Sequence, residues 1–297
     1  MARDFAPGQT ATLWVYDLAT DAAREVLTSS TLLFEAPNWM SDGSALVVNG
    51  GGRLFWAPTG ATPGDAELTE IDLGGIPEIN NDHVLAPDGS TVYVSAQDGH
   101  LYAIPLDGSG PRQVSRDHGD FRHYLHGVSR DGSTLAYIGL SWEGEQRVTN
   151  VYLLPLGGSE IQLTDDGFQD DGAEFGPGPD GAEWVYFNSE RAGGVAGHAQ
   201  LFRMRPDGAS VTQLTHDERV NWFPHPSPDG AHVVYVSYPP GTEGHPENIA
   251  DVRIRLTTPA GGTGRELVTV FGGQGAMNVG SWAPNSSAFA YVSYSEV

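Results

Sequence analysis

Hydrophobic and polar residues alternate in short segments along nearly the whole chain, and turns that contain glycine separate these segments. Residues 91–95, 201–204 and 232–237 are typical, because they are rich in β-branched and aromatic side chains. Alternation with a period of two between Asp-Gly turns is typical of antiparallel β hairpins. No segment shows convincing helical periodicity. The pattern therefore predicts an all-β protein.

One turn recurs ahead of the alternating strands and has the form small residue-Pro-Asp-Gly, or a close variant. Its Asp or Asn is residue 42, 88, 131, 180, 229 and 285, so successive turns are 43 to 56 residues apart. This is the period of a four-stranded propeller blade. The repeats predict a single-domain, six-bladed β-propeller with four antiparallel strands in each blade. The expected blades are approximately residues 33–75, 76–118, 119–166, 167–217, 218–272 and 273–297 plus 1–30.

The sixth repeat supplies only two inner strands at the C-terminal end of the chain, at 281–282 and 288–293. Two alternating segments near the other end, 13–18 and 24–28, have no repeat of their own. We expect these N-terminal strands to complete the last blade, because closing the ring in this way removes exposed sheet edges.

The turns and strands together resemble a known repeat. Ser-Pro-Asp-Gly turns, the Tyr-Val-Ser strands that follow, and the Gln-Leu-Thr ends at 162–164 and 213–215 are similar to the WD40-like repeats of TolB-type propellers. This resemblance covers essentially the whole chain and implies the fold. Segments 80–83, 221–225 and 272–278 also resemble, more distantly, oligogalacturonate lyases. In those longer, seven-bladed propellers, His and Gln residues hold a divalent metal at one mouth of the channel.

Composition excludes several classes of function. The 38 acidic residues outnumber the 15 basic ones, all arginine, and the formal charge is −23. This charge opposes binding to nucleic acid. The absence of cysteine and lysine excludes disulfides, thiol nucleophiles and Schiff bases. No apolar run reaches the roughly 18 residues of a membrane span. We expect a monomer that is cytoplasmic as given, or periplasmic or secreted if a signal peptide has been removed.

The order of strands in a blade determines which connections share a face of the ring. The entries to the innermost strands and the loops between second and third strands lie on one face, called here the loop face. The Pro-Asp-Gly turns lie on the other, the turn face. The long connections all map to the loop face, at residues 139–149, 188–200 and 238–250, and at 74–82, 116–125 and 269–279. Because long loops on a rigid scaffold often bind ligands, we predict binding there.

Polar residues of the innermost strands and of the loop-face loops are expected to gather at the channel mouth. The candidate ligand-binding residues are Asn81, Asp82, His83, His123, His126, Glu174, Trp222, His225, His245 and Asn278. This set could bind a divalent metal, or it could bind sugar hydroxyls with Trp222 or Tyr124 as a stacking surface. The channel histidines could equally form only structural hydrogen bonds.

Two metal sites are predicted more specifically. His83, His225 and Gln274 come from three blades, and we expect them to share a divalent ion such as Mn²⁺, Zn²⁺ or Ni²⁺. The acidic stretch 165–172 could instead bind Ca²⁺, although its spacing differs from an EF-hand.

Three functions remain open. The first is binding of a small or oligomeric polar ligand, such as a carbohydrate, at one mouth of the channel. The second is a metal-dependent lyase that acts on a uronate-containing oligosaccharide, with a histidine, tyrosine or arginine as base. The third is a protein-interaction scaffold, which the resemblance to TolB implies because the TolB propeller binds an envelope lipoprotein. No catalytic residue can be assigned.

Overall fold

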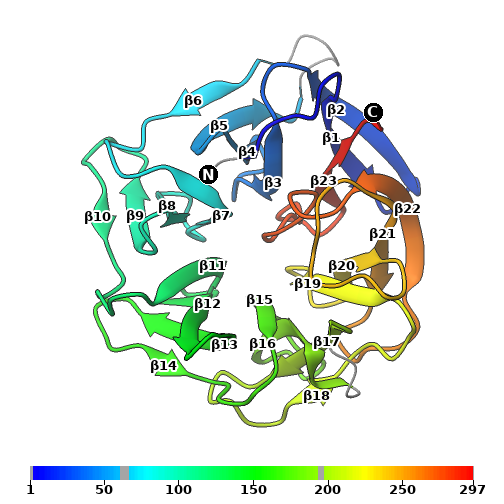
Figure 1. The fold of residues 1–297 in the computed structure, drawn as a ribbon. Helices are drawn as coiled ribbons and strands as arrows, with labels where there is room; N and C mark the ends of the chain where they lie inside the picture. The colour runs from blue at the N-terminus through cyan, green and yellow to red at the C-terminus, as the bar shows by residue number, and fades with distance from the viewer. Residues whose placement is uncertain (1–2, 61–66, 193–196, 297) are drawn as a thin grey trace.

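A computed structural model describes residues 3–60, 67–192 and 197–296, and its sheets form a ring of six blades around a central axis (Figure 1). In blades one to five the four strands are antiparallel and follow one another in sequence from the centre outward. The predicted six-bladed propeller is confirmed.

The blades contain strands of similar length and order. Blades one to three consist of β3 (Phe34–Trp39), β4 (Ala45–Gly50), β5 (Arg53–Pro58), β6 (Thr69–Ile71), β7 (Ile79–Leu85), β8 (Thr91–Ala96), β9 (Leu101–Pro105), β10 (Arg112–Gln113), β11 (Arg122–Val128), β12 (Thr134–Glu143), β13 (Gln146–Pro155) and β14 (Ile161–Gln162). Blades four and five consist of β15 (Asp170–Pro177), β16 (Glu183–Ser189), the 3₁₀ turn η1 (Glu190–Ala192), β17 (Gln200–Met204), β18 (Thr212–Gln213), β19 (Val220–Pro226), β20 (Val233–Tyr238), β21 (Ile249–Thr257) and β22 (Arg265–Gly272).

The sixth blade joins the two ends of the chain, as predicted. Strand β1 (Ala11–Asp17) pairs antiparallel with β23 (Ala288–Tyr294) along its whole length, and β2 (Ala22–Ser29) lies outside β1. Only an isolated bridge from Trp282 to Phe289 represents the innermost strand. The ring is therefore closed by strands from both ends of the chain.

The hydrophobic core lies between neighbouring blades. Val234 and Val236 of β20, for example, belong to one buried cluster with Phe289 and Tyr291 of β23. Each blade packs its two apolar faces against the two neighbouring blades. This burial of apolar surface is the main contribution to the stability of the fold.

In blades one to five the pairing of the innermost strand is interrupted at a similar position along the strand. Pairing with the second strand shifts register between Glu35 and Asn38, and likewise between residues 79 and 83, 125 and 127, 171 and 174, and 222 and 225. Ala36 and Phe223 have positive φ angles of 52° and 53° at these points. Such bulges break the alternation and redirect side chains. They bring additional polar side chains toward the channel.

One connection differs from expectation. Residues 139–149 were expected to form a long loop, but β12 and β13 extend through most of this segment as a regular hairpin. Within the described ranges, no helix has the length and apolar character needed to cross a membrane.

Candidate functional site

The chain itself crosses the channel. Residues 273–281, here called the plug, leave β22 and reach the centre of the ring before β23 begins (Figure 1). Two histidines, one from blade three and one from blade five, hold the plug through its backbone. The Nδ1 atom of His126 lies 3.1 Å from the carbonyl oxygen of Asn278, and Nε2 of His225 lies 3.1 Å from that of Met277. The plug divides the channel into two compartments.

On the loop-face side of the plug, four ionisable side chains form a carboxylate–imidazole cluster: Asp82, His126, Asp171 and His245. Asp171 is at its centre, with Oδ1 3.0 Å from Nε2 of His126 and Oδ2 3.4 Å from Nε2 of His245. Asp82 is buried near all three and accepts a hydrogen bond of 2.6 Å from Asn80. The bulged strands β7, β11 and β15 supply three of these residues, and the loop between β20 and β21 supplies His245, so four blades contribute to the cluster.

Burial and charge act in opposite directions on this cluster. Burial would lower the pKa of His126, but the carboxylates of Asp82 and Asp171 outweigh it and raise the pKa to about 9. Burial would raise the pKa of Asp171, but hydrogen bonds and charge from His126 and His245 outweigh it and lower the pKa well below its usual range. For Asp82 burial dominates and raises the pKa to about 6. The cluster therefore holds an imidazolium beside an ionised carboxylate at neutral pH.

The predicted metal ligands are engaged elsewhere. His225 directs Nδ1 to Glu174 Oε2 at 2.6 Å and Nε2 to a plug carbonyl, so each nitrogen faces an acceptor. His83 is fully buried between β7 and β4, with each ring nitrogen 3.3 Å from a backbone carbonyl, and burial lowers its pKa to about 4. Neither ring directs a free lone pair toward a shared ion.

Gln274, the third predicted ligand, makes contacts through its backbone. Its N–H donates to Pro246 and its carbonyl accepts a hydrogen bond from Arg3. Across residues 3–60, 67–192 and 197–296, no group of three or more His, Asp or Glu side chains is arranged to hold a metal ion. The residues present do not fit a resident divalent metal.

The loop-face end of the channel holds a guanidinium pocket, defined by the residues that surround Arg3. Nη1 of Arg3 donates to Glu35 Oε1 at 3.0 Å and to the Gln274 carbonyl at 2.9 Å, and Nη2 donates to Asn248 Oδ1 at 2.9 Å. Its Nε is 2.9 Å from Glu247, and the guanidinium lies 4.2 Å from the ring centroid of Tyr294. Burial raises the pKa of Glu35 to about 7, and Arg3 opposes this shift.

On the turn-face side the channel is open. A funnel of about 660 Å³ is lined by residues from all six blades. Its walls include the Pro-Asp-Gly turn prolines and two tryptophans, Trp39 and Trp282, and Glu174 lies in its lining.

A smaller pocket of about 450 Å³, whose lining includes His118, Phe121 and Trp142, lies among the loop-face segments. Binding on the loop face therefore stays a prediction. The loop 238–250 and the plug fold back over the loop-face mouth of the channel, as the contacts of His245 and Pro246 show.

Glu174 connects the funnel with the plug. Its Oε2 is bonded to His225, while a Cβ at Gly280, another lining residue, would lie 2.9 Å from Oε1. Burial raises the pKa of Glu174, although His225 opposes this shift. Glu174 thus presents a second carboxylate oxygen next to the funnel.

The remaining candidates have mostly structural positions. His123 lies between blades two and three, with Nδ1 2.7 Å from Gly99 O and Nε2 3.2 Å from Glu160. Trp222 is 5% exposed and packs on His245 with ring centroids 4.5 Å apart, so no face of it is open for stacking a sugar. The side chain of Asn278 accepts a hydrogen bond from Gly275 N at 2.7 Å within the plug. Asn81 is buried on β7, and its carbonyl faces His83.

Sequence reasoning missed three residues at the channel: Arg3, Glu35 and Asp171. Arg3 lies in a segment without alternation, and Glu35 lies in an innermost strand that contains no histidine. Asp171 belongs to the acidic stretch 165–172 considered for Ca²⁺. Its neighbours point elsewhere, because Asp166 and Asp170 both pair with Arg191, at 3.2 and 2.9 Å.

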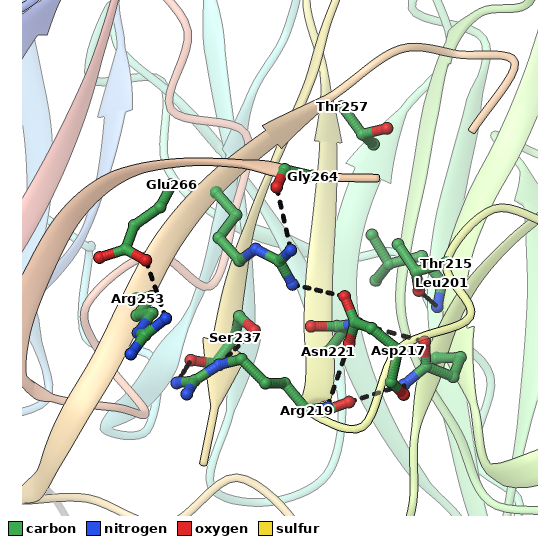
Figure 2. A network of polar contacts seen from close by, with 12 residues as sticks. Leu201, Thr215, Asp217, Arg219, Asn221, Ser237, Arg253, Thr257, Gly264 and Glu266 are labelled. Carbon is green, nitrogen blue, oxygen red and sulfur yellow. Dashed lines mark hydrogen bonds and ion pairs between the residues drawn. The ribbon is translucent and has the colours of Figure 1, made fainter. Parts of the chain in front are cut away.

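A second polar network, centred on Asp217, ties the loop before β19 to the outer strands of blade five (Figure 2). Asp217 Oδ2 pairs with Arg255 at 2.5 Å, and its Oδ1 accepts from Asn221 Nδ2 at 3.1 Å. Arg219 continues the network to Ser237, with Nε 3.1 Å from the hydroxyl oxygen. It shares no residue with the carboxylate–imidazole cluster.

Comparisons with known proteins place this geometry in context. No protein-family profile matches the chain. An uncharacterised protein of Agrobacterium fabrum (strain C58) is 36% identical over 285 residues, which cover 94% of this chain and 91% of the relative. A solved structure from Agrobacterium tumefaciens, described as a TolB candidate, superposes with a TM-score of 0.86 at 34% identity over 98% of this chain and 100% of that one.

Two more distant structures share the fold. Oligogalacturonate lyase in complex with manganese gives a TM-score of 0.59 at 17% identity, over 91% of this chain and 75% of the lyase. TolB from Acinetobacter baumannii gives 0.60 at 18% identity, over 89% of this chain and 64% of that protein. At these identities the likeness concerns the fold alone.

Proposed function

The chain belongs to the TolB-like family of six-bladed propellers, and we propose that it is a binding protein whose turn-face funnel takes a cationic group carried on an apolar stem. The observation that carries this proposal is Glu174, whose second carboxylate oxygen lies beside the funnel. A volume of about 660 Å³ is in the range of small-molecule sites.

The charge of the funnel favours a cation. Glu174, Glu183 and Asp229 line it, against one arginine, Arg130. The whole chain adds a formal charge of −23, which attracts cations to the mouth and repels anions. An amine, amidine or guanidine could donate a charge-assisted hydrogen bond to Glu174.

The walls of the funnel favour an apolar stem. Trp39, Trp282 and Phe175 supply aromatic surface, and prolines from the turns add surface that has no N–H donor. An aromatic or aliphatic stem would bury its surface there, while its charged end reaches Glu174. A uronate oligosaccharide is anionic and fits this arrangement less well.

Isothermal titration with benzamidine tests the proposal, and benzamide is its neutral counterpart. We expect benzamidine to bind one site per chain and benzamide to bind at least tenfold more weakly. Glu174→Gln should weaken benzamidine at least tenfold, whereas Arg130→Ala should strengthen it severalfold by removing the positive charge at the mouth. Glu70→Gln, in an exposed ion pair with Arg53, is the matched control.

Equal affinity for benzamide, or an unchanged affinity in Glu174→Gln, would contradict the cationic assignment. Digalacturonate is the third probe. If it bound while benzamidine did not, the carbohydrate alternative would replace the proposal.

A further inference from the structure

The guanidinium pocket is built entirely by parts of the chain that do not deliver Arg3. Glu35 comes from β3, Glu247 and Asn248 precede β21, the Gln274 carbonyl belongs to the plug, and Tyr294 ends β23. Three acceptors take hydrogen bonds from the two terminal nitrogens of the guanidinium, Glu247 lies beside Nε, and an aromatic ring covers one face. This arrangement is selective for arginine, because an ammonium group has neither the fork nor the flat face.

The pocket favours a bound cation, because without one Glu35 is buried either as an unpaired anion or in its protonated form. Glu35 is 6% exposed, and Asp82 and Glu247 add negative charge to its surroundings. A buried carboxylate without a cationic partner is strongly destabilising. If Arg3 leaves, the pocket therefore favours replacement by another cation over remaining without one.

Arg3 can leave without disturbing a sheet. Residues 3–10 precede β1, which begins at Ala11, and they form no strand. Side-chain hydrogen bonds hold this segment, among them Gln9 Nε2 to Asn248 Oδ1 at 2.6 Å and Thr10 N to Ser295 Oγ at 2.9 Å, and Phe5 packs against the core. The cation is thus attached to a segment outside the sheets, while its acceptors are attached to the ring.

We propose that the guanidinium pocket is a binding site for an arginine side chain of another protein, presented on an extended segment, which exchanges with Arg3. The site lies on the loop face, across the plug from the funnel, so it stands independently of the function proposed above. Arg3 acts as a tethered competitor whose effective concentration is in the millimolar range, and it lowers the apparent affinity for the incoming arginine.

Isothermal titration with two synthetic peptides tests this exchange. One is the acetylated and amidated segment Ala-Arg-Asp-Phe-Ala, which copies residues 2–6, and the other replaces its arginine with citrulline, a neutral analogue of the same shape. We expect Arg3→Gln to bind the arginine peptide at least tenfold more tightly than the wild type does. The citrulline peptide should not bind detectably, and adding Glu35→Gln to Arg3→Gln should weaken the arginine peptide at least tenfold.

Two variants serve as controls. Arg24→Ala removes an arginine whose guanidinium donates to the Thr59 carbonyl at 2.8 Å, and it should behave as the wild type. Arg3→Lys keeps a cation without the fork, so it should fold and still accept the peptide if Arg3→Gln does not fold. A folded Arg3→Gln or Arg3→Lys that fails to bind the arginine peptide would overturn the proposal, and so would equal binding of the citrulline peptide. Agmatine that binds as tightly as the peptide would also overturn it, because the ligand would then be a small guanidine.

Discussion

The Asp217 network and the carboxylate–imidazole cluster are both polar networks that join different segments of the chain, and they differ in the cation that they use. Asp217 is paired with Arg255 and with the amide of Asn221. Asp171 is paired with two imidazoles, His126 and His245. Arginine stays charged at every pH at which the protein folds, whereas His126 loses its proton as the pH rises through about 9. The cation of the first network is therefore permanent, and that of the second depends on pH.

The two networks also differ in where they lie within the blades. The Asp217 network joins a loop to outer strands through direct pairs (Figure 2). The cluster depends on bulged strands around the plug, and Nδ1 of its member His245 is buried without a hydrogen-bond partner among the described residues. Asn221 Oδ1 in the Asp217 network is also without one. The two networks therefore differ in their position and in their cation, and not in how completely their polar groups are paired.

The largest predicted effect concerns the ring that both networks require. Deleting residues 1–30 removes β1 and β2 and leaves β23 without its partner along its whole length. We expect complete loss of the cooperative unfolding transition in urea and of the native near-ultraviolet circular dichroism. A truncated chain with the wild-type melting temperature would refute closure by these strands and with it the comparison.

The Asp217 network should contribute more to stability than any exposed ion pair in the same blade. Asp217→Ala leaves Arg255, which is nearly buried, without its carboxylate, and we expect a loss of about 3 kcal/mol in the free energy of unfolding. Urea denaturation measures this loss. Arg253→Ala breaks the exposed pair with Glu266 and should cost about 0–1 kcal/mol. Equal losses in the two variants would remove the distinction between the Asp217 network and a surface pair.

Because of the channel cluster, the free energy of unfolding should fall as the pH rises from neutral to alkaline values. The pKa of His126 rises from 6.5 to about 9 on folding, so the folded state keeps a proton that the unfolded chain releases. Its contribution is complete below about pH 6.5 and is lost as the pH rises through 9. Between these values we expect the wild type to lose about 2 kcal/mol more than His126→Gln does. Parallel urea denaturation curves at pH 6.5 and 9 measure this difference, and identical slopes in the two proteins would contradict it.

The smallest effect is expected at a Pro-Asp-Gly turn. Asp88 is exposed and uses Oδ1 to accept hydrogen bonds from the backbone and hydroxyl of Ser90, at 2.9 and 2.7 Å. Asp88→Asn keeps this acceptor, so the urea midpoint should stay within error of the wild type. Benzamidine affinity should also be unchanged, although the neighbouring Pro87 lines the funnel. A clear change in affinity would show that the turns act directly in binding.

The fold was predictable because each blade repeats one local pattern, and local patterns are read directly from sequence. The site was only partly predictable. Asp82, His126 and His245 were among the ten residues expected at the channel mouth, and the structure brings these three together. The bulges decide which side chains point inward, and His126 is the residue that its bulge adds. Nothing in the spacing of residues 238–250 or 273–281 indicated that both segments fold over the loop-face mouth. The metal prediction did not consider backbone carbonyl oxygens, which lie within hydrogen-bonding distance of both ring nitrogens of His83.

The pairing that closes the ring also determines how the molecule responds to a pulling force. Ala11 pairs with Tyr294, so the first residue of β1 and the last residue of β23 lie side by side at one edge of the blade. A force applied between these two ends loads the hydrogen bonds one pair at a time, from Ala11 toward Asp17, instead of loading the seven pairs together. The propeller should therefore open at a low force, by separation of one residue pair after another. The same pairing of β1 with β23 is nevertheless essential for stability when no force is applied.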